Sequence, residues 1–449
     1  MTFEKSLEEM MGVVKQWNSE KNVTEVTVIR DVLGRCSLIL GARQHIEAAK
    51  LDALRAAARA KLGSYYRDVI YCKNDANNDL VKGMIKIADA QRLDYSTEEG
   101  VQWYVLERAI AKKAWVNCNY KEDAIWPYSE AIAGKKPKVV TFYSFKGGMG
   151  RTTALAAAAI GLAQRGKNVL IIDTDVEAPG LASLFIPESE VDYGIVDYLL
   201  EGKISGDQYD MAKGLRQISD PILMNGLMGK LFVIPAGKID SDYLQKLARI
   251  DYQDTIPGNM KRQICAIMDQ AISAISGMCQ VDYILLDSRA GFHDMGGVVT
   301  TQIPHGVVCF GKESKQSWQG VNLVIRAIAS SQREKPFVAI VDSAWEQSGV
   351  VSTDAKQIFK KEAYEICCNS YYDGEFQPGL EADGEVHSPI FVPFYPVLSK
   401  NIALYSDGSE VANEAVQQIK SIMQQENYQE ITNRIESWFG SDEGGAGNE

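Results

Sequence analysis

The sequence predicts an α/β protein with a mostly parallel β-sheet covered by helices on both faces, preceded by a small α+β domain. Two observations lead to this fold class. Beyond residue 137, short and nearly continuous apolar runs alternate with helical segments, as in strands that are buried on both faces of a parallel sheet. The residues before this point lack that alternation and combine amphipathic helical stripes with a hairpin pattern.

The N-terminal region, residues 1–133, is the predicted α+β module. Two apolar stretches within residues 24–40 flank a turn at Gly34 and predict a β-hairpin. Residues 44–63 have the apolar spacing of a helix that ends at Gly63, and residues 64–72 follow as a third strand. Two further helices are expected at about 79–92 and 98–114. Residues 134–137, with a glycine, two lysines and a proline, predict a linker.

The main domain is expected over residues 138–400. Its seven apolar runs are the predicted strands, at 138–144, 168–173, 231–235, 282–287, 306–310, 336–341 and 389–394. Ligands bind such sheets at the carboxyl ends of the strands. Residues 401–449 are expected to form a helical segment, at about 408–438, and then an acidic disordered tail.

Composition narrows the class of protein. The chain has 449 residues and a net charge of −12, which argues against a general nucleic-acid coat and still leaves room for a local basic patch. Eight cysteines with no C-x-x-C pair, and only four histidines, predict reduced cytoplasmic thiols rather than a disulfide framework or a zinc site. The N-terminus does not resemble a signal peptide, and no stretch approaches 18 uninterrupted apolar residues.

A glycine-rich loop follows the first predicted strand of the main domain. The segment YSFKGGMGRTT, residues 143–153, is similar to the phosphate-binding pattern G-x-x-x-x-G-K-[ST]. Phe145 stands at the position of the first glycine, and Arg151 stands at the position of the lysine. The loop precedes an alanine-rich helix, whose positive N-terminal end attracts phosphate. A glycine-rich turn without a ligand is the alternative.

Aspartates follow two other strands of the same predicted sheet. Asp173 ends one strand and Asp175 comes two residues later, while Asp287 ends another. Single aspartates after strands are usually helix caps or turn residues. Several at one edge beside a glycine loop predict instead a place for Mg²⁺ and an attacking water.

Together these segments resemble the deviant Walker-A ATPases of the ParA/MinD type, whose loop is K-G-G-x-G-K-[ST]. Residues 146–150 match that signature, including its extra lysine, Lys146. Asp173 and Asp175 match the carboxylates of switch I, and DSRAG, residues 287–291, resembles switch II. The resemblance covers about residues 138–400 and does not extend to residues 1–133.

The resemblance implies a cytoplasmic, ATP-dependent switch that forms a homodimer with ATP between the subunits and hydrolyses it slowly. Lys146 would reach the partner's phosphates, and Arg151 would replace the Walker lysine within its own subunit. Asp175 would orient or activate the attacking water. Mg²⁺ would be held by Thr152, Asp173 and Asp287. The expected nucleotide-binding residues are Lys146, Gly147, Gly148, Met149, Gly150, Arg151, Thr152, Thr153, Asp342, Pro393 and Phe394.

Two of these positions depart from the family pattern. Asp342 stands where the family often has an asparagine that reads adenine, and a carboxylate can accept the adenine amino proton but cannot also donate. Arg289 replaces the proline of switch II. Arg289 is expected either to sense the γ-phosphate or to form a surface salt bridge.

Three other functions stay open. The replacement of lysine by Arg151 allows a catalytically inactive nucleotide-binding scaffold. An iron-protein-like reductase would need paired cysteines after the switch regions, and Cys309 is the one cysteine that follows the DSRAG segment closely. A bacterial tyrosine kinase would have clustered tyrosines in its tail, whereas the tyrosines here are dispersed.

The expected partner is an unknown protein bound through residues 1–133, and plasmid maintenance or anti-phage defence is the process that the resemblance suggests. Membrane binding is not expected, because the apolar stripe at Tyr428, Ile431, Ile435 and Trp438 lacks a basic face and is expected to pack on the protein's own core. Nucleic acid is a less favoured partner. Its candidate sites are two basic clusters, at residues 55–61 and 356–361.

Overall fold

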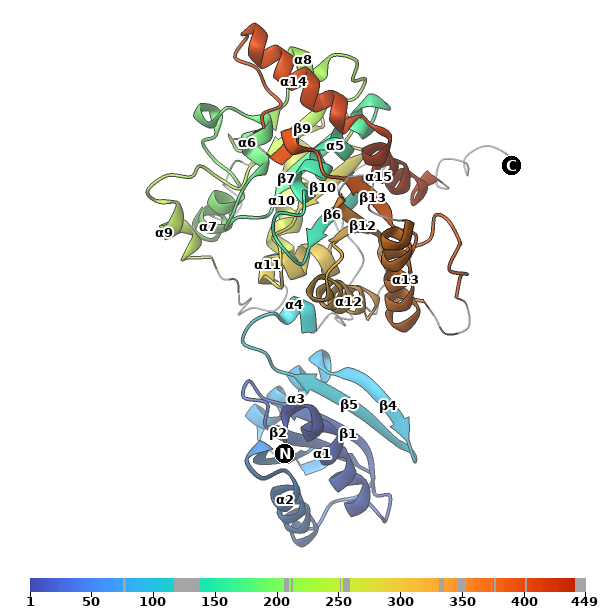
Figure 1. Ribbon diagram of the computed structural model, residues 1–449. Coiled ribbons are helices and arrows are strands. Elements are labelled where there is room, and N and C mark those ends of the chain that lie inside the picture. Colours follow the sequence, from blue (N-terminus) through green and yellow to red (C-terminus); the bar gives the residue numbers. More distant parts are fainter. Residues whose placement is uncertain are drawn as a thin grey trace, which may run out of the picture. The chain divides into compact units, whose positions relative to one another are not determined.

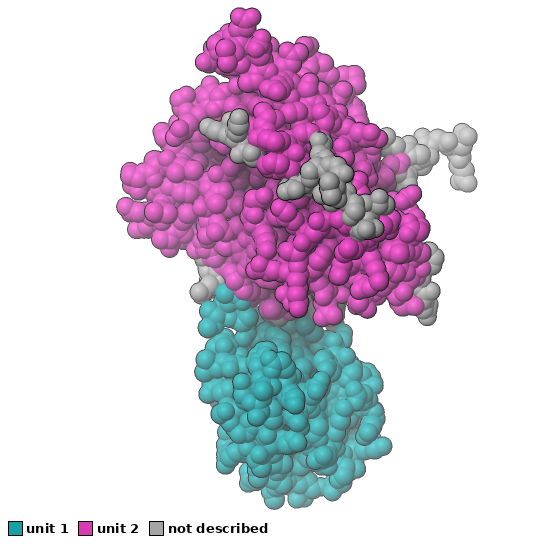
Figure 2. Space-filling model, viewed as in Figure 1, with its two compact units in different colours: residues 1–111 teal, residues 112–449 magenta. Residues whose placement is uncertain are grey.

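The computed structural model describes residues 1–449 except 76–77, 117–136, 206–209, 211–212, 251, 253–258, 331–334, 346–352, 373, 375–376, 400–401 and 441–449. The described chain divides into two compact units, Met1–Ala111 and Lys112–Glu449 (Figure 2). The division falls before the predicted boundary at residue 133. Residues 134–136 of the predicted linker and residues 441–449 of the predicted tail lie outside the described residues.

Unit 1 is an α+β module built on a five-stranded sheet of order β3-β2-β1-β5-β4. Helices α1 and α2 pack on one face of the sheet, and α3 packs on the other through Ile85 and Ala88. The elements are α1 (Phe3–Trp17), β1 (Val23–Arg30), β2 (Cys36–Ala42), α2 (Ala48–Leu62), η1 (Gly63–Tyr65), β3 (Tyr66–Cys72), η2 (Lys73–Asp75), α3 (Asp79–Gln91), β4 (Leu93–Glu98) and β5 (Val101–Glu107).

One predicted element of unit 1 is wrong. Residues 98–114 were expected to be helical, but residues 93–107 form the antiparallel pair of β4 and β5. Val101, Trp103 and Val105 alternate with less buried residues along β5, and β-branched and aromatic side chains favour such a half-buried strand. The predicted hairpin of β1 and β2 is confirmed.

Unit 2 is built on an eight-stranded sheet of order β13-β12-β11-β6-β10-β7-β9-β8 (Figure 1). Every pairing in it is parallel except that of β8 with β9. The seven predicted strands are all present, and β8 is an additional edge strand. The strands are β6 (Lys138–Ser144), β7 (Val169–Asp173), β8 (Arg216–Gln217), β9 (Leu231–Ile234), β10 (Tyr283–Asp287), β11 (Gly306–Gly311), β12 (Phe337–Trp345) and β13 (Ile390–Pro393).

Helices cover both faces of this sheet, as predicted. One face packs against α5, α14 and α15, and the other packs against α10, η6, α12 and α13. The helices of unit 2 are α4 (Lys113–Val116), α5 (Arg151–Gln164), α6 (Leu181–Phe185), η3 (Glu188–Glu190), α7 (Ile195–Ser205), α8 (Pro221–Met224), α9 (Tyr243–Leu247), α10 (Asn259–Ile275), α11 (Asp294–Gly297), the π-helix η6 (Val298–Gln302), α12 (Lys315–Ala329), α13 (Thr353–Ser370), η7 (Pro396–Ser399), α14 (Glu410–Met423) and α15 (Glu426–Ser437).

The C-terminal apolar stripe packs on the protein's own core, as the sequence predicts. Tyr428, Ile431 and Ile435 are buried on α15 in the core that includes α5. The ring of Trp438 stacks on Phe337 of β12, with the two planes inclined by 7°. No helix in the described ranges is long and apolar enough to cross a membrane.

The loop after β6 is held in place by the packing of the Phe145 ring. Phe145 lies against Gly320 of α12 so closely that a Cβ at residue 320 would come 2.1 Å from Phe145 Cγ. The ring also packs on Phe292, with centroids 5.3 Å apart. Phe145 therefore occupies the position of a loop glycine by using space that the missing side chain of Gly320 leaves.

We expect Gly320→Ala to destabilise unit 2 by about 1–3 kcal/mol, because Phe145 Cγ lies next to the backbone and cannot move away easily. Urea unfolding followed by circular dichroism measures the change. Gly277→Ala is the matched control, since a Cβ there meets no atom within 4 Å. Equal stability of the two variants would contradict the contact.

Candidate functional site

The loop between β6 and α5 presents its glycines to open space. Gly148 and Gly150 have φ angles of 73° and 68°, a region that residues with a side chain rarely adopt. A Cβ at Gly147, Gly148 or Gly150 would meet no heavy atom within 4 Å. Gly150 is the N-cap of α5, so the positive end of this helix lies at the loop. Such a loop can bind phosphate groups through its backbone N–H groups.

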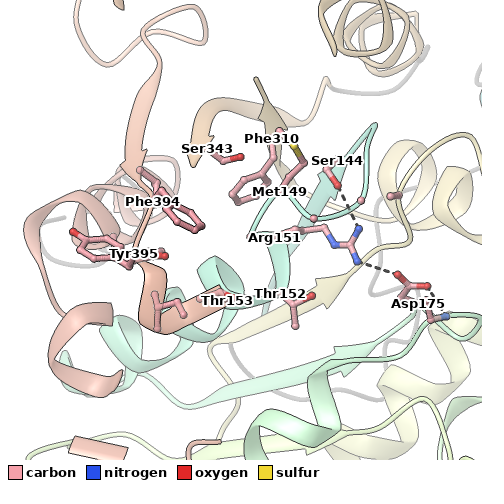
Figure 3. Close-up of a pocket in the computed structure, with 18 of the residues that line it drawn as sticks. Ser144, Met149, Arg151, Thr152, Thr153, Asp175, Phe310, Ser343, Phe394 and Tyr395 are labelled. Atoms are coloured by element: carbon pink, nitrogen blue, oxygen red, sulfur yellow. Dashed lines mark hydrogen bonds and ion pairs between the residues drawn. The ribbon is translucent and has the colours of Figure 1, made fainter. Parts of the chain in front are cut away.

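The loop forms one wall of a cavity of about 650 Å³ (Figure 3). The structure brings most of the predicted site residues to this cavity. They are Gly147, Gly148, Met149, Gly150, Arg151, Thr152, Thr153, Asp175, Arg289, Pro393 and Phe394. Sequence reasoning missed the other lining residues, which are Ser144, Ala178, Ala290, Phe310, Ser343, Val392, Tyr395, Leu398 and Tyr428.

Arg151 is a buried cation among carboxylates. Its Nε donates to Asp287 Oδ1 at 2.6 Å, and its Nη2 donates to Asp175 Oδ2 at 3.0 Å. Its Nη1 lies 3.4 Å from Ser144 Oγ. The side chain thus points toward the carboxylates at the strand ends, and Figure 3 shows it directed away from Phe394 and Ser343. Breaking a buried ion pair of this kind is costly unless a new partner replaces the old one.

Thr152 lines the cavity, and it pairs with Asp287, which ends β10 and is buried just behind the cavity wall. Thr152 Oγ1 donates to Asp287 Oδ2 at 2.6 Å. Burial raises the pKa of Asp287, and the Arg151 guanidinium and the Thr152 hydroxyl oppose that shift. A hydroxyl and a carboxylate oxygen are the ligand types that Mg²⁺ takes beside nucleotide phosphates.

Asp173 ends β7, as predicted, but its side-chain contacts differ from those expected of a metal ligand. It does not line the cavity, and both of its oxygens accept backbone N–H groups. Oδ1 accepts from Asp175 at 3.1 Å, and Oδ2 accepts from Leu181 at 3.1 Å and from Gly180 at 3.3 Å. Burial and the nearby charge of Asp287 raise the pKa of Asp173 well above its usual value. This side chain holds the turn after β7, so its placement does not support the predicted role as a metal ligand.

Asp175 links the segments that follow β7 and β10. Its Oδ1 lies 3.4 Å from Arg289 Nη1, while Oδ2 binds Arg151. Arg289 Nη2 lies 3.0 Å from Glu177 Oε2, and the other Glu177 oxygen lies 2.7 Å from His293 Nε2. Arg289 therefore has both an ion-pair partner and a place in the cavity wall.

The cavity wall at β12 is Ser343 rather than the predicted Asp342. Side chains alternate along a strand, and Val341 packs with the α5 face while Ile340 packs with the α12 face. Ser343 shares the side of Val341, and its buried Oγ has no hydrogen-bond partner within the described ranges. The apolar run 336–341 hides this alternation, because both faces of the strand are buried.

Lys146 does not line the cavity. Its side chain is half-buried, and no carboxylate of the described part of the chain lies within 4 Å of its ammonium group. Unlike Lys146, most of the basic residues in the two predicted basic clusters form ion pairs. Arg55, Arg59 and Lys61 each pair with an acidic residue, and Lys360 pairs with Glu381 at 2.8 Å.

Comparison with known proteins addresses the same part of the chain. Residues 137–290 match a family described as an AAA domain. Over 155 residues the chain is 31% identical to the septum site-determining protein MinD of Buchnera aphidicola subsp. Schizaphis graminum, which covers 34% of this chain and 45% of that protein. MinD of Escherichia coli K12 is 30% identical over 110 residues, or 24% of this chain and 36% of that protein. Residues 137–290 form a P-loop domain of the ParA/MinD type.

The chain spans less than half the length of these curated relatives. Among solved structures, the chain is similar to pNOB8 ParA at 18% identity and a TM-score of 0.46, over 67% of this chain and 99% of that one. The MinD cell division protein of Aquifex aeolicus gives 19% identity and a TM-score of 0.38, covering 66% and 97%.

The buried carboxyl group of Asp342, next to the candidate site, has an altered pKa that can be tested. Burial raises its pKa to about 7, with Glu313 adding to the shift and Lys312 and Lys356 opposing it. Because the folded pKa lies above the unfolded value of 3.8, this group's contribution to stability falls as the pH rises between these values.

We therefore expect Asp342→Asn to be more stable than the natural protein at pH 8 by about 1–3 kcal/mol, and to lose that advantage near pH 4. Urea unfolding at both pH values measures this. Asp192→Asn, at an exposed aspartate, is the control. An advantage of the same size at both pH values would show that folding does not raise the pKa of Asp342.

Proposed function

We propose that unit 2 binds ATP with Mg²⁺ in the cavity beside the glycine loop, hydrolyses it slowly, and uses the difference between ATP and ADP to control dimerisation and a partner. The observation that carries the proposal is the open loop at the head of α5, with the Thr152–Asp287 pair directly behind it. The loop supplies backbone donors for phosphate, and the pair supplies oxygens for a metal ion.

The remaining cavity wall fits a nucleoside. Pro393, Phe394 and Tyr395 provide apolar and aromatic surface for a base. The buried Oγ of Ser343 lacks a partner in the described structure and can both donate and accept a hydrogen bond. Ser343 is thus a better candidate for contacting the base than Asp342, which lies on the other face of β12.

Thr152 and Asp287 would hold Mg²⁺, which when bound neutralises charge on the β- and γ-phosphate oxygens. Asp175 is the proposed group that orients the attacking water and accepts its proton at a carboxylate oxygen. Both of its oxygens are occupied by arginines in this structure. Hydrolysis would require at least one arginine to leave, which is consistent with slow turnover.

A nucleotide-binding scaffold without turnover is the second candidate function. It is favoured by the position of Arg151, which contacts two carboxylates where a Walker lysine would contact phosphate. Arginine keeps the positive charge but has a different length and a planar set of donors. If the protein binds ATP but hydrolyses it no faster than ATP hydrolyses in solution, the scaffold function is correct.

We further propose that Lys146 acts across a homodimer. Its side chain is absent from the cavity wall of its own subunit. It is also unpaired among the residues that the structure describes. A lysine in this position is available to bind phosphate in a second, symmetry-related copy, so that the nucleotide forms part of a two-fold interface.

Calorimetry with the full chain tests nucleotide binding. We expect ATP to bind in the presence of Mg²⁺, and Thr152→Ala to lose most of the difference between binding with Mg²⁺ and binding with excess chelator. Thr97→Ala in unit 1 is the control, because that threonine is exposed on β4.

Asp175→Ala should bind ATP but hydrolyse it more slowly. An absence of ATP binding with Mg²⁺ would end the proposal.

Analytical ultracentrifugation tests the dimer. In an Asp175→Ala background, ATP should increase the mass toward that of a dimer, and ADP should not. Adding Lys146→Ala should abolish the increase, whereas Lys238→Ala, at an exposed lysine outside the cavity, should leave it. A mass that is independent of nucleotide, or a Lys146→Ala variant that dimerises equally well, would rule out the trans contact.

A further inference from the structure

We propose that Arg289 is the residue by which this site distinguishes a nucleoside triphosphate from a diphosphate, and that its movement is passed through Glu177 and His293 to residues 112–116. In the structure Arg289 is paired with Asp175 and Glu177. A terminal phosphate would take it from these carboxylates. The inference rests on the proposed function, since it concerns the same cavity.

Arg289 stands at the boundary between the cavity and an ion-pair cluster. It lines the cavity, and its side chain is 28% exposed, so the guanidinium is accessible to a ligand. The segment that carries it is fixed beside the phosphate-binding loop, because Gly291 N donates to Ser144 O at 3.1 Å. A bidentate guanidinium suits a phosphate group better than it suits two separate carboxylates.

The ion pairs of Asp175 determine which of its two arginines a phosphate group can take. Arg151 and Arg289 occupy different oxygens of the same carboxylate, and Arg151 is buried and also bound to Asp287. Arg289 has the longer contact to Asp175, at 3.4 Å, and its second partner, Glu177, is 37% exposed. Exposed ion pairs contribute little free energy, so Arg289 is the arginine that a new anion can displace more easily.

A chain of contacts leads from Arg289 to the start of unit 2. Glu177, the partner of Arg289, also binds His293 Nε2 at 2.7 Å. The carbonyl oxygen of His293 accepts a hydrogen bond from Trp115 Nε1 at 2.8 Å. Trp115 lies on α4, only a few residues after the end of unit 1 at Ala111.

The same short helix is attached to the segment after β10 at further points. The Trp115 ring packs on Phe292 with centroids 5.1 Å apart. Lys112 Nζ lies 2.9 Å from Asp294 Oδ2. Ala114 O accepts from Thr301 Oγ1 at 3.0 Å. A shift of residues 288–294 would therefore change the environment of residues 112–116, the first residues of unit 2.

Nucleotide affinities test the sensing role. With the full chain and Mg²⁺, Arg289→Ala should weaken binding of a non-hydrolysable ATP analogue about ten-fold, the scale of one charge-assisted hydrogen bond, and leave ADP binding unchanged. Glu177→Gln should strengthen binding of the analogue, because it weakens the competing ion pair. Arg216→Ala is the control, since Arg216 is similarly exposed and pairs with Asp192 outside the cavity.

Equal effects of Arg289→Ala on the two nucleotides, or no effect on either, would overturn the sensing role while leaving the proposed function intact. A natural protein that binds neither nucleotide would overturn both. A purely structural ion pair predicts that Glu177→Gln does not strengthen binding, so that variant separates the two explanations.

Hydrogen exchange tests whether the change at Arg289 reaches residues 112–116. The amides of Trp115 and Val116 bond to Lys112 O, and their exchange should differ between the analogue and ADP in the natural protein. The difference should disappear in Arg289→Ala at saturating nucleotide and persist in Arg216→Ala. A difference that survives in Arg289→Ala would show that residues 112–116 respond through another route.

Discussion

The site depends on one buried contact, the ion pair of Arg151 with Asp287 and Asp175. These groups come from the beginning of α5, the last residue of β10 and the segment after β7, and the guanidinium holds all three together at the carboxyl edge of the sheet. Asp173 is also buried at this edge, where burial and the nearby charge of Asp287 raise the pKa of its carboxyl group. The ion pairs with Arg151 offset part of the free-energy cost of burying Asp175 and Asp287.

Much of the main fold follows from the sequence because its strands are buried on both faces. Such strands are continuous apolar runs, and their parallel pairing places every strand end at one edge, so the grouping of Asp175 and Asp287 near the loop is predictable. The same continuity hides which face a residue occupies. This is why Ser343, and not Asp342, lies at the cavity. The strand β5 was predicted as a helix, although its buried residues Val101, Trp103 and Val105 recur at every second position, as in a strand.

The direction of a polar side chain depends on tertiary partners that no local pattern shows. Asp173 and Asp175 are two residues apart, yet one binds backbone N–H groups and the other binds two arginines. Likewise, Glu177 and His293 are separated by 116 positions and meet only because the turns after β7 and β10 adjoin. Sequence reasoning placed the candidate carboxylates at one edge of the sheet, whereas the contacts that each of them makes required the structure.

The contact between Phe145 and Gly320 has a consequence for how this loop can change in evolution. A phenylalanine in the loop requires a helix that carries no side chain where the ring lies, and a glycine in α12 leaves a void unless a ring fills it. Each residue on its own is therefore a defect, and only the two together are tolerated. Relatives that have a small residue at position 145 are expected to have a larger one at position 320. The two positions should vary as a pair although 175 residues separate them.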